Sequence, residues 1–192
     1  MTASVERFVR VEGRRIAALL HPRPVYLISA CGPDGITNVA TVAWVTPLSH
    51  TPPLVGLSVR PSSRTGTLIA ESGEFVVNVV DTSMCSAVRY CGNAANSGTD
   101  KADDLSLELV RAEEVAPPRL GAALGWLECR VERRIEVGDH ALFVARVLVA
   151  CAREGFDGAW DPESAPVLLC LAHDRFGRLT ETDAQPQGAK RP

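Results

Sequence analysis

Short apolar runs that end in turn residues recur along the chain, and this pattern constrains its fold more than any other feature. Residues 25–30 (VYLISA) and 36–44 (ITNVATVAW) flank Gly32-Pro33-Asp34-Gly35, and that turn composition predicts a β-hairpin. The remaining runs with strand character are residues 54–60, 74–80, 105–110, 126–137, 141–154 and 166–172. The regular alternation of strand and helix that builds a parallel sheet is missing. The sequence therefore predicts a mainly β fold with some α, an antiparallel barrel with a few peripheral helices.

The helical segments are few. Apolar and charged residues alternate over residues 1–20 in a way that predicts a short amphipathic N-terminal helix. A second helix is expected from about Thr65 to Ser72, closing at Gly73, and a third within residues 82–91.

The length of 192 residues is typical of one domain, which we place at residues 21–180. Residues 92–104 are rich in Gly, Asn, Ser and Asp, so a long surface loop is expected there. The polar residues 181–192 are expected to form a disordered tail.

Composition and charge argue against several classes of protein. The net charge of −3 provides no basic field, so nucleic-acid binding is not expected. No apolar run reaches the length of a membrane span, and the N-terminus carries charges where a secretory signal would be apolar. We therefore expect a cytoplasmic protein without membrane contact. The six cysteines form no CxxC pair and the histidines lack metal-ligand spacing, so neither disulfides nor a metal centre are expected.

The strand at 54–60 runs into a loop that suits an anion. Arg60 and Arg64 supply guanidinium groups, whose charge-assisted bonds to phosphate oxygens are short and strong. At Gly66 the backbone could approach a ligand with bare N–H groups, and the helix that follows would add the positive end of its dipole. Hydroxyl groups come from Ser58, Ser62, Ser63, Thr65 and Thr67.

The same loop has a structural alternative, in which Ser62 or Ser63 only caps the helix. The chain contains neither GxxxxGK[ST] nor GxGxxG after a strand, so it matches neither a P-loop nor a Rossmann fingerprint. The loop by itself leaves both interpretations open.

Four segments, taken together, resemble the flavin reductase-like family of FMN-binding split barrels, which includes flavoredoxins and small flavin reductases. They are HPRPVYLISACGPDGITNVATVAW at 21–44, PPLVGLSVRPSSRTGTLIAESGEFVVNV at 52–79, the CG…SG…DK run at 91–101, and LECRV…GDHALFVARV at 127–147. They span most of residues 21–180 in the family's order. The resemblance implies an antiparallel FMN-binding split β-barrel.

In this family the second strand of the hairpin lies beside the isoalloxazine ring and donates backbone N–H groups to it. The resemblance therefore assigns residues 36–44 to the flavin, with Asn38 as the polar side chain. Small residues allow close approach of a ring, whereas the structural alternative makes Val39 and Val42 core residues and Thr41 a good strand former. The residues assigned to the cofactor on this strand are Asn38, Ala40, Thr41, Val42 and Ala43.

The loop after residue 57 matches the family's S-x-R-P-x-x-x-T stretch, which holds the ribityl chain and phosphate of FMN. By this resemblance the cofactor-binding residues are Ser58, Arg60, Ser63, Arg64 and Thr65. Lys101 matches the lysine of the family's D-K pair, although Ala102 replaces the phenylalanine that usually follows. On the sequence alone, Lys101 would be a solvated surface residue.

His140 lies in a turn between two strong strands. In related reductases the matching histidine contacts the nicotinamide of the reductant or the edge of the flavin, so His140 is the expected catalytic residue. The structural alternative is a turn histidine bonded to its own backbone. Asp139 beside it could fix the tautomer of the ring or raise its pKa.

The leading hypothesis is an FMN-binding oxidoreductase, an NAD(P)H-dependent flavin reductase-like protein that transfers hydride through flavin N5. The resemblance implies a homodimer with FMN at the interface, and the apolar strands 74–80 and 141–150 are interpreted as interface residues. A flavin-dependent monooxygenase is a candidate partner. The alternatives are a flavoredoxin-like electron carrier, an FMN-dependent enzyme acting on a small organic substrate, and a β-barrel binding protein without flavin.

Overall fold

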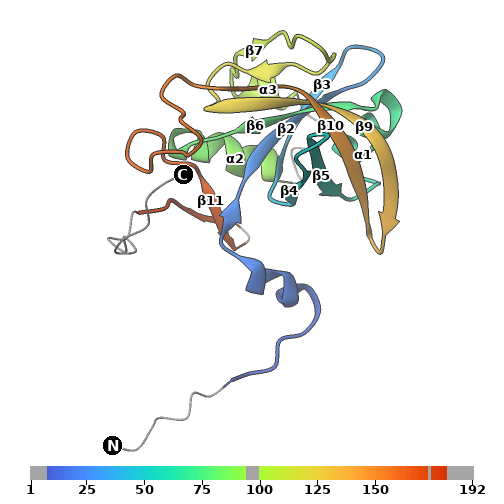
Figure 1. Ribbon diagram of the computed structural model, residues 1–192. Coiled ribbons are helices and arrows are strands. Elements are labelled where there is room, and N and C mark those ends of the chain that lie inside the picture. The colour runs from blue at the N-terminus through green and yellow to red at the C-terminus, as the bar shows by residue number, and fades with distance from the viewer. Residues whose placement is uncertain (1–7, 94–99, 173, 181–192) are drawn as a thin grey trace, which may run out of the picture.

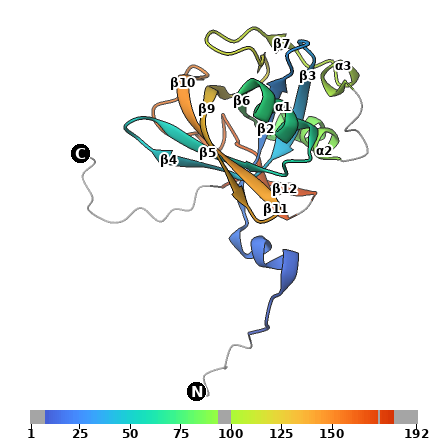
Figure 2. The same ribbon diagram turned by 90° about the vertical axis from the view of Figure 1, so that its right-hand side faces the viewer.

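A curled seven-stranded antiparallel sheet forms the body of the protein, in a computed structural model that describes residues 8–93, 100–172 and 174–180 (Figures 1 and 2). Its strands pair in the order β3-β2-β6-β9-β10-β5-β4. Their bounds are Tyr26–Cys31 (β2), Thr37–Val42 (β3), Val45–Ser49 (β4), Leu54–Val59 (β5), Glu74–Val79 (β6), Gly125–Val137 (β9) and His140–Ala152 (β10).

The two edge strands of this sheet, β3 and β4, are consecutive in the chain, with only Ala43 and Trp44 between them. The amide of Ser58 on β5 donates to the carbonyl of Trp44 at 2.9 Å. The sheet must therefore curl until its first and last strands meet, as strands do when they close a barrel. The antiparallel barrel predicted from the sequence is confirmed.

Alternate side chains of the strands fill the inside of the barrel, as the period of two in a strand requires. Phe75 on β6 and Phe143 on β10 are almost fully buried there. The other buried residues of this cluster are Ile28, Ala30, Val55, Leu57, Val59, Ile69, Val77, Cys129, Ala141 and Ala145. Because the interior is a packed core, a ligand has to bind outside it.

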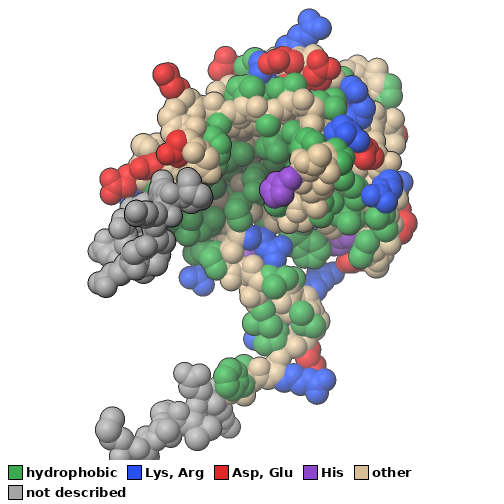
Figure 3. All heavy atoms as spheres, in the orientation of Figure 1, with side chains coloured by type: hydrophobic (Ala, Val, Ile, Leu, Met, Phe, Trp, Pro, Cys, Tyr) green, Lys and Arg blue, Asp and Glu red, His purple; other side chains and the backbone are tan. Residues whose placement is uncertain are grey.

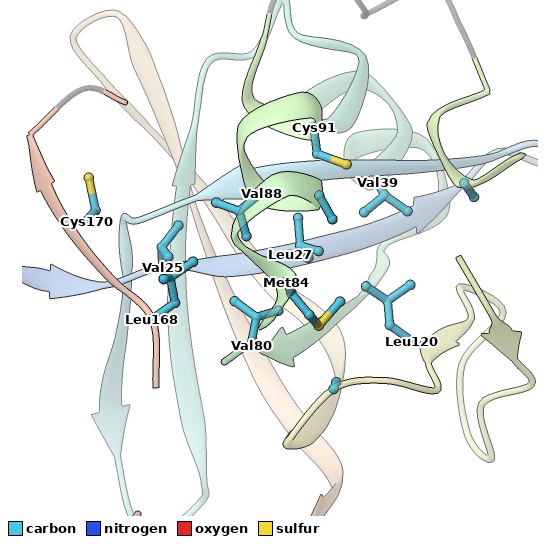
Figure 4. Packing of buried hydrophobic residues seen from close by; sticks show 13 residues of the cluster. Val25, Leu27, Val39, Val80, Met84, Val88, Cys91, Leu120, Leu168 and Cys170 are labelled. Atoms are coloured by element: carbon cyan, nitrogen blue, oxygen red, sulfur yellow. The ribbon is translucent and has the colours of Figure 1, made fainter. Parts of the chain in front are cut away.

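A second apolar cluster lies between the barrel wall and helix α2 (Cys85–Gly92) (Figure 4). Leu27 on β2 and Val39 on β3 belong to it, together with Met84 and Val88 from the α2 region. The hydroxyl of Thr41 on β3 donates to the carbonyl of Val88 at 2.6 Å. These contacts fix α2 against the edge strand β3.

The remaining elements are short. Helix α1 (Arg64–Ser72) ends at Gly73, whose φ of 71° gives the left-handed cap that the sequence predicted. Residues Thr82–Met84 form a 3₁₀ turn, η2, before α2, and Lys101–Asp104 form α3. Two small sheets complete the fold, one of β1 (Arg23–Pro24), β11 (Leu169–Ala172) and β12 (Arg175–Gly177), the other of β7 (Leu109–Val110) and β8 (Arg119–Leu120).

Two expectations about single elements were wrong, and one strand was not expected. The unexpected strand is the edge strand β4, where Pro47 is tolerated because an edge strand leaves some N–H groups unpaired. The loop expected at 92–104 contains α3, which begins where the carboxylate of Asp100 accepts bonds from two backbone amides. Only Leu109–Val110 of the run 105–110 is a strand.

The helix expected over residues 1–20 is reduced to a 3₁₀ segment, η1 (Gly13–Leu20), and residues 8–12 are not helical. Residues 1–7 and the tail expected at 181–192 lie outside the described residues. η1 projects below the body in Figure 1, and none of its residues is buried. In the part of the chain that the structure describes, no helix is long and apolar enough to cross a membrane.

Strand β6 is buried on both faces within one chain. Its apolar residues are therefore no evidence for a subunit interface, contrary to the interpretation from the sequence. Phe75 and Val77 belong to the barrel interior, whereas Val76 packs against Ala112 and Val115 on the other side. The apolar composition of residues 74–80 is thus explained within one chain.

Candidate functional site

The end of β5 and the start of α1 form a tight turn held by a serine cap. Ser63 is the N-cap of α1, and its hydroxyl accepts a bond from the amide of Gly66 at 3.1 Å. The same hydroxyl donates to the carbonyl of Arg60 at 2.7 Å. The capping role considered for Ser63 is therefore confirmed, and the cap fixes the backbone on which Arg60 and Arg64 stand.

Gly66 does not offer the bare N–H group that the sequence suggested, because its amide is the donor to the cap. A side chain here would overlap the carbonyl oxygen of Arg60 and come within 3.2 Å of that of Pro61. Glycine is needed because the first turn of α1 packs directly on the loop backbone.

Strand β3 is tied to this turn by a buried hydrogen bond. The side-chain amide of Asn38 donates to the hydroxyl of Thr65 at 2.9 Å, and both side chains are buried. This hydrogen bond holds β3 beside the first turn of α1. Because β3 is an edge strand, a row of its backbone groups lacks partners in the sheet.

Lys101 is buried, with an exposed fraction of 6%, so the expectation of a solvated lysine from sequence alone was wrong. Its ammonium group donates to the carbonyl of Cys91 in the last turn of α2 at 3.1 Å. The negative end of that helix favours a cation there. Burial lowers the pKa of Lys101 below its ordinary value; Cys91 raises that pKa and the positive charge of Arg64 lowers it.

Cys91 itself is a poor nucleophile. Burial raises the pKa of its thiol to about 11, although Lys101 acts in the opposite direction. The neutral thiol therefore dominates near pH 7, and thiolate chemistry is not available.

These elements enclose a cavity of about 840 Å³, which we call the cationic pocket. Its charged or titratable lining side chains are Arg60, Arg64, Lys101, His140 and the neutral thiol Cys91, and no carboxylate from the described residues lines it. In the same part of the chain, no carboxylate lies within ion-pair distance of the two arginines or of Lys101. The pocket therefore has a surplus of positive charge that an anion would balance.

The structure brings all twelve residues singled out in the sequence into the lining of this one pocket. They are Asn38, Ala40, Thr41, Val42, Ala43, Ser58, Arg60, Ser63, Arg64, Thr65, Lys101 and His140. Small side chains of β3 line the pocket, together with Arg60 and Arg64 from the loop and α1 and Lys101 from α3. This arrangement fits a flat ring system that carries a phosphate, because the ring can lie along the edge strand while the phosphate reaches the cations.

His140 is the first residue of β10 and lines the pocket. Its Nδ1 lies 2.8 Å from the carboxylate of Asp139, and this hydrogen bond is the main reason that the pKa of Asp139 is lowered. The imidazole also packs against the indole of Trp44, with ring centroids 4.7 Å apart and planes tilted by 30°. The ring is therefore oriented by two neighbours, rather than being bonded only to its own turn.

Sequence reasoning gave no role to the side chain of Trp44, although it assigned the strand 36–44 to the flavin, and it gave no role to the residues at the end of α2. Trp44 stands at the exit of a recognised strand, and its aromatic ring beside small residues was a signal that could have been used. No local signal placed Cys91, Gly92 and Asn93 in the pocket. Their position depends on the packing of α2 against β3, which is a long-range contact.

The protein is a curled antiparallel barrel with a pocket rich in cationic side chains beside its edge strand β3. The matches with known proteins give its family. The model described as "Flavin reductase like domain" matches residues 18–179. The chain belongs to this flavin reductase-like family, and the split-barrel fold expected from the resemblance is confirmed.

Among curated relatives, an uncharacterized protein of Archaeoglobus fulgidus is 35% identical over 179 residues, covering 92% of this chain and 97% of the relative. The reductase component of 4-nitrophenol 4-monooxygenase/4-nitrocatechol 2-monooxygenase of Rhodococcus opacus is 33% identical over 122 residues, covering 64% of this chain and 62% of the relative. Among solved structures, flavoredoxin of Methanosarcina acetivorans superposes with a TM-score of 0.82 at 24% identity, covering 95% of this chain and 97% of that one.

Proposed function

We propose that the protein is an FMN-binding oxidoreductase that takes hydride from NADH or NADPH, and that the cationic pocket is its FMN site. The observation that carries the proposal is the surplus of positive charge beside a small-residue edge strand. A phosphate at Arg60, Arg64 and Lys101 would neutralise that charge. Membership of the flavin reductase-like family supports the same assignment.

In this proposal the side chains of the loop and of α1 hold the phosphate end. Arg60 and Arg64 supply the guanidinium donors, and the N-terminus of α1, a helix of nine residues, adds its dipole. Ser58 lies beside them in the pocket and is suited to bond the polar chain that links ring and phosphate.

Strand β3 would hold the ring. Its unpaired backbone groups can bond to the polar edge of an isoalloxazine, and Ala40 and Ala43 leave room for the ring to approach. The bound flavin would supply the hydride chemistry, accepting hydride at N5. The residues of the chain would bind, orient and exclude water; the proposal requires no nucleophile among them.

His140 is proposed to act on the reductant side of the site. Because its Nδ1 faces the carboxylate of Asp139, the Nε2 atom remains to meet a ligand. Trp44 limits the rotation of the imidazole by packing against it. These two contacts would hold the imidazole of His140 in one orientation in the pocket lining.

The family likeness also supports a homodimer and, by analogy with the Rhodococcus relative, delivery of reduced flavin to a monooxygenase. Both belong to the proposal. A protein that retains FMN and exchanges electrons without a pyridine nucleotide would instead be a carrier.

The test is an absorbance spectrum of the purified protein, FMN titration by fluorescence quenching, and anaerobic addition of NADH and NADPH. We expect FMN to bind and its visible band to bleach with one of the two nucleotides. His140→Ala should retain FMN and bleach more slowly, with His50→Ala, at an exposed histidine outside the pocket lining, as the matched control. If FMN does not bind, the assignment of the pocket is wrong; if neither nucleotide bleaches the flavin, the NAD(P)H step is wrong.

A further inference from the structure

The four-residue helix α3 carries Lys101 into the cationic pocket, and few other contacts hold it there. Figure 2 shows α1, α2 and α3 beside strand β3. A helix this short is not stable by itself in water, so α3 depends on its contacts with the rest of the chain. Its one buried apolar side chain is that of Ala102, and a methyl group gains little by burial.

Two side-chain hydrogen bonds join α3 to α2. Inside the protein, the ammonium group of Lys101 donates to the carbonyl of Cys91 at 3.1 Å. At the surface, the hydroxyl of Tyr90 donates to the carboxylate of Asp104 at 2.7 Å. Neither Tyr90 nor Asp104 lines the cationic pocket, so the outer bond can be removed without changing the pocket itself.

The buried ammonium group is the unfavourable part of this arrangement. It has three donors, and the described residues supply one acceptor, the carbonyl of Cys91. The positive charge of Arg64 also acts against it. Burial of a cation without an anionic partner is costly. An empty pocket therefore favours release of Lys101 to water.

The solvent side of α3 is acidic. Asp103 and Asp104 are exposed, and Asp100 precedes the helix. Figure 3 shows acidic side chains at the end of the body where β7 and α3 lie in Figure 1. Water and these carboxylates can stabilise the ammonium group once α3 leaves the pocket. A phosphate in the pocket would have the opposite effect, because it stabilises the docked form.

We propose that α3 is an anion-dependent latch on the cationic pocket, docked through Lys101 when a phosphate is bound and released when the pocket is empty. The inference rests on the proposed function for the identity of the ligand, FMN. A ligand that binds the docked form better shifts the population of α3 towards it. Loss of the phosphate and release of α3 would then occur together, which suits a flavin that is exchanged rather than held permanently.

The first experiment is hydrogen exchange of the full-length protein alone, with FMN, with riboflavin and with inorganic phosphate. The amides of Asp104, Leu105 and Leu107 donate backbone bonds to Asp100 and to residues of α3, so they report its docking. Saturating FMN should slow their exchange by about tenfold or more. Riboflavin has the same ring and ribityl chain but no phosphate, and it should bind without slowing them.

The second experiment measures the affinities of FMN and riboflavin for variants of α3. Asp104→Ala removes the outer bond and should weaken FMN by about three- to tenfold while leaving riboflavin affinity unchanged. Asp103→Ala is the matched control, because it removes the same charge from the next position of α3, where the carboxylate has no bond among the described residues. In the Lys101→Met background, Asp104→Ala should weaken FMN no further, since Lys101 links the latch to the phosphate.

Equal protection of α3 by riboflavin and FMN would overturn the latch. Equal FMN affinities of Asp104→Ala and Asp103→Ala would also overturn it, as would additive effects of Asp104→Ala and Lys101→Met. If neither flavin binds, the proposed function fails, and inorganic phosphate then tests the latch by itself. Slower exchange of the α3 amides in phosphate would support the latch in that case, and unchanged exchange would overturn it.

Discussion

Arg60 and Arg64 bring two positive charges to the same pocket without a carboxylate partner among the described residues. Like charges in one pocket disfavour the folded state, and a bound anion removes that penalty. Their lack of partners is therefore better explained by ligand binding than by structural stabilisation.

Arg60→Ala and Arg64→Ala should produce folded protein with weaker FMN binding. Loss of a charge-assisted bond to phosphate costs about 1.5–3 kcal/mol, which is about tenfold to a hundredfold in affinity. Titration of FMN fluorescence measures the effect, and exposed Arg111→Ala serves as the matched control. Unchanged FMN affinity in both variants would refute the phosphate assignment.

Lys101 should make FMN affinity depend on pH. Burial lowers the pKa of its ammonium group, so the protein without ligand loses this charge at a pH below the ordinary value of about 10.4. The charged form attracts the phosphate; affinity should therefore be constant below the lowered pKa and fall as pH rises through it.

The measurement is FMN affinity between neutral and alkaline pH for the wild type and for Lys101→Met. The variant keeps the ionisation of the flavin itself and lacks that of Lys101, so the difference between the two curves isolates the lysine. We expect weaker binding by Lys101→Met at neutral pH and convergence of the curves at alkaline pH. If the two curves of FMN affinity against pH stay parallel, the protonation of Lys101 does not affect FMN binding in this pH range.

The residues of the loop could be predicted from sequence because their chemistry is local. Arg60, Ser63 and Arg64 lie within five positions, and the turn alone brings them together. Burial of Lys101 could not be predicted in this way, since it depends on the carbonyl of Cys91 at the end of another helix. The stacking of Trp44 on His140 likewise joins strands that are far apart in the chain.

At the scale of elements, the contact of α1 with the preceding loop sets the geometry of the pocket. Gly66→Ala would push the helix away from the carbonyl oxygens of Arg60 and Pro61, because both obstacles are backbone atoms. Overpacking of this kind costs about 1–3 kcal/mol.

We expect Gly66→Ala to lower the free energy of unfolding by that amount and to weaken FMN binding, since Arg60 and Arg64 move with the loop. Denaturant unfolding and FMN titration measure the two effects. Glu71→Ala, at an exposed position of the same helix, is the control and should change neither. A Gly66→Ala protein with wild-type stability would show that the first turn of α1 is not tightly packed.

Elements were predictable where local turn chemistry determines them. The hairpin of β2 and β3 follows from Gly32-Pro33-Asp34-Gly35, and the end of α1 follows from Gly73. Strand β4 was missed because Pro47 and the prolines after it resemble a loop, and only the position of β4 at the sheet edge makes them acceptable. An edge position is a property of the sheet and cannot be read from a single segment.

At the scale of the whole molecule, the N-terminal segment η1 (Gly13–Leu20) leaves its apolar side chains uncovered. Ile16, Leu19 and Leu20 of η1 have exposed fractions of 55%, 68% and 69%. An isolated helical segment of eight residues is marginal in water, and most helical stability in proteins comes from packing of an apolar face. The exposed apolar residues of η1 are therefore better candidates for a subunit interface than those of β6, because both faces of β6 are covered within one chain.

We therefore predict a homodimer in which FMN binding depends on the second subunit. Light scattering at micromolar concentration should give about twice the chain mass of 20.6 kDa. Leu19→Glu should raise the dissociation constant of the dimer and lower FMN content together, since a charge on η1 opposes burial against a partner. Leu179→Glu, an equally conspicuous exposed leucine near the other end of the described chain, is the matched control and should leave the mass unchanged. A wild-type monomer that binds FMN fully would contradict both the dimer and the dependence of the site on it, and would make each barrel edge a complete site within one chain.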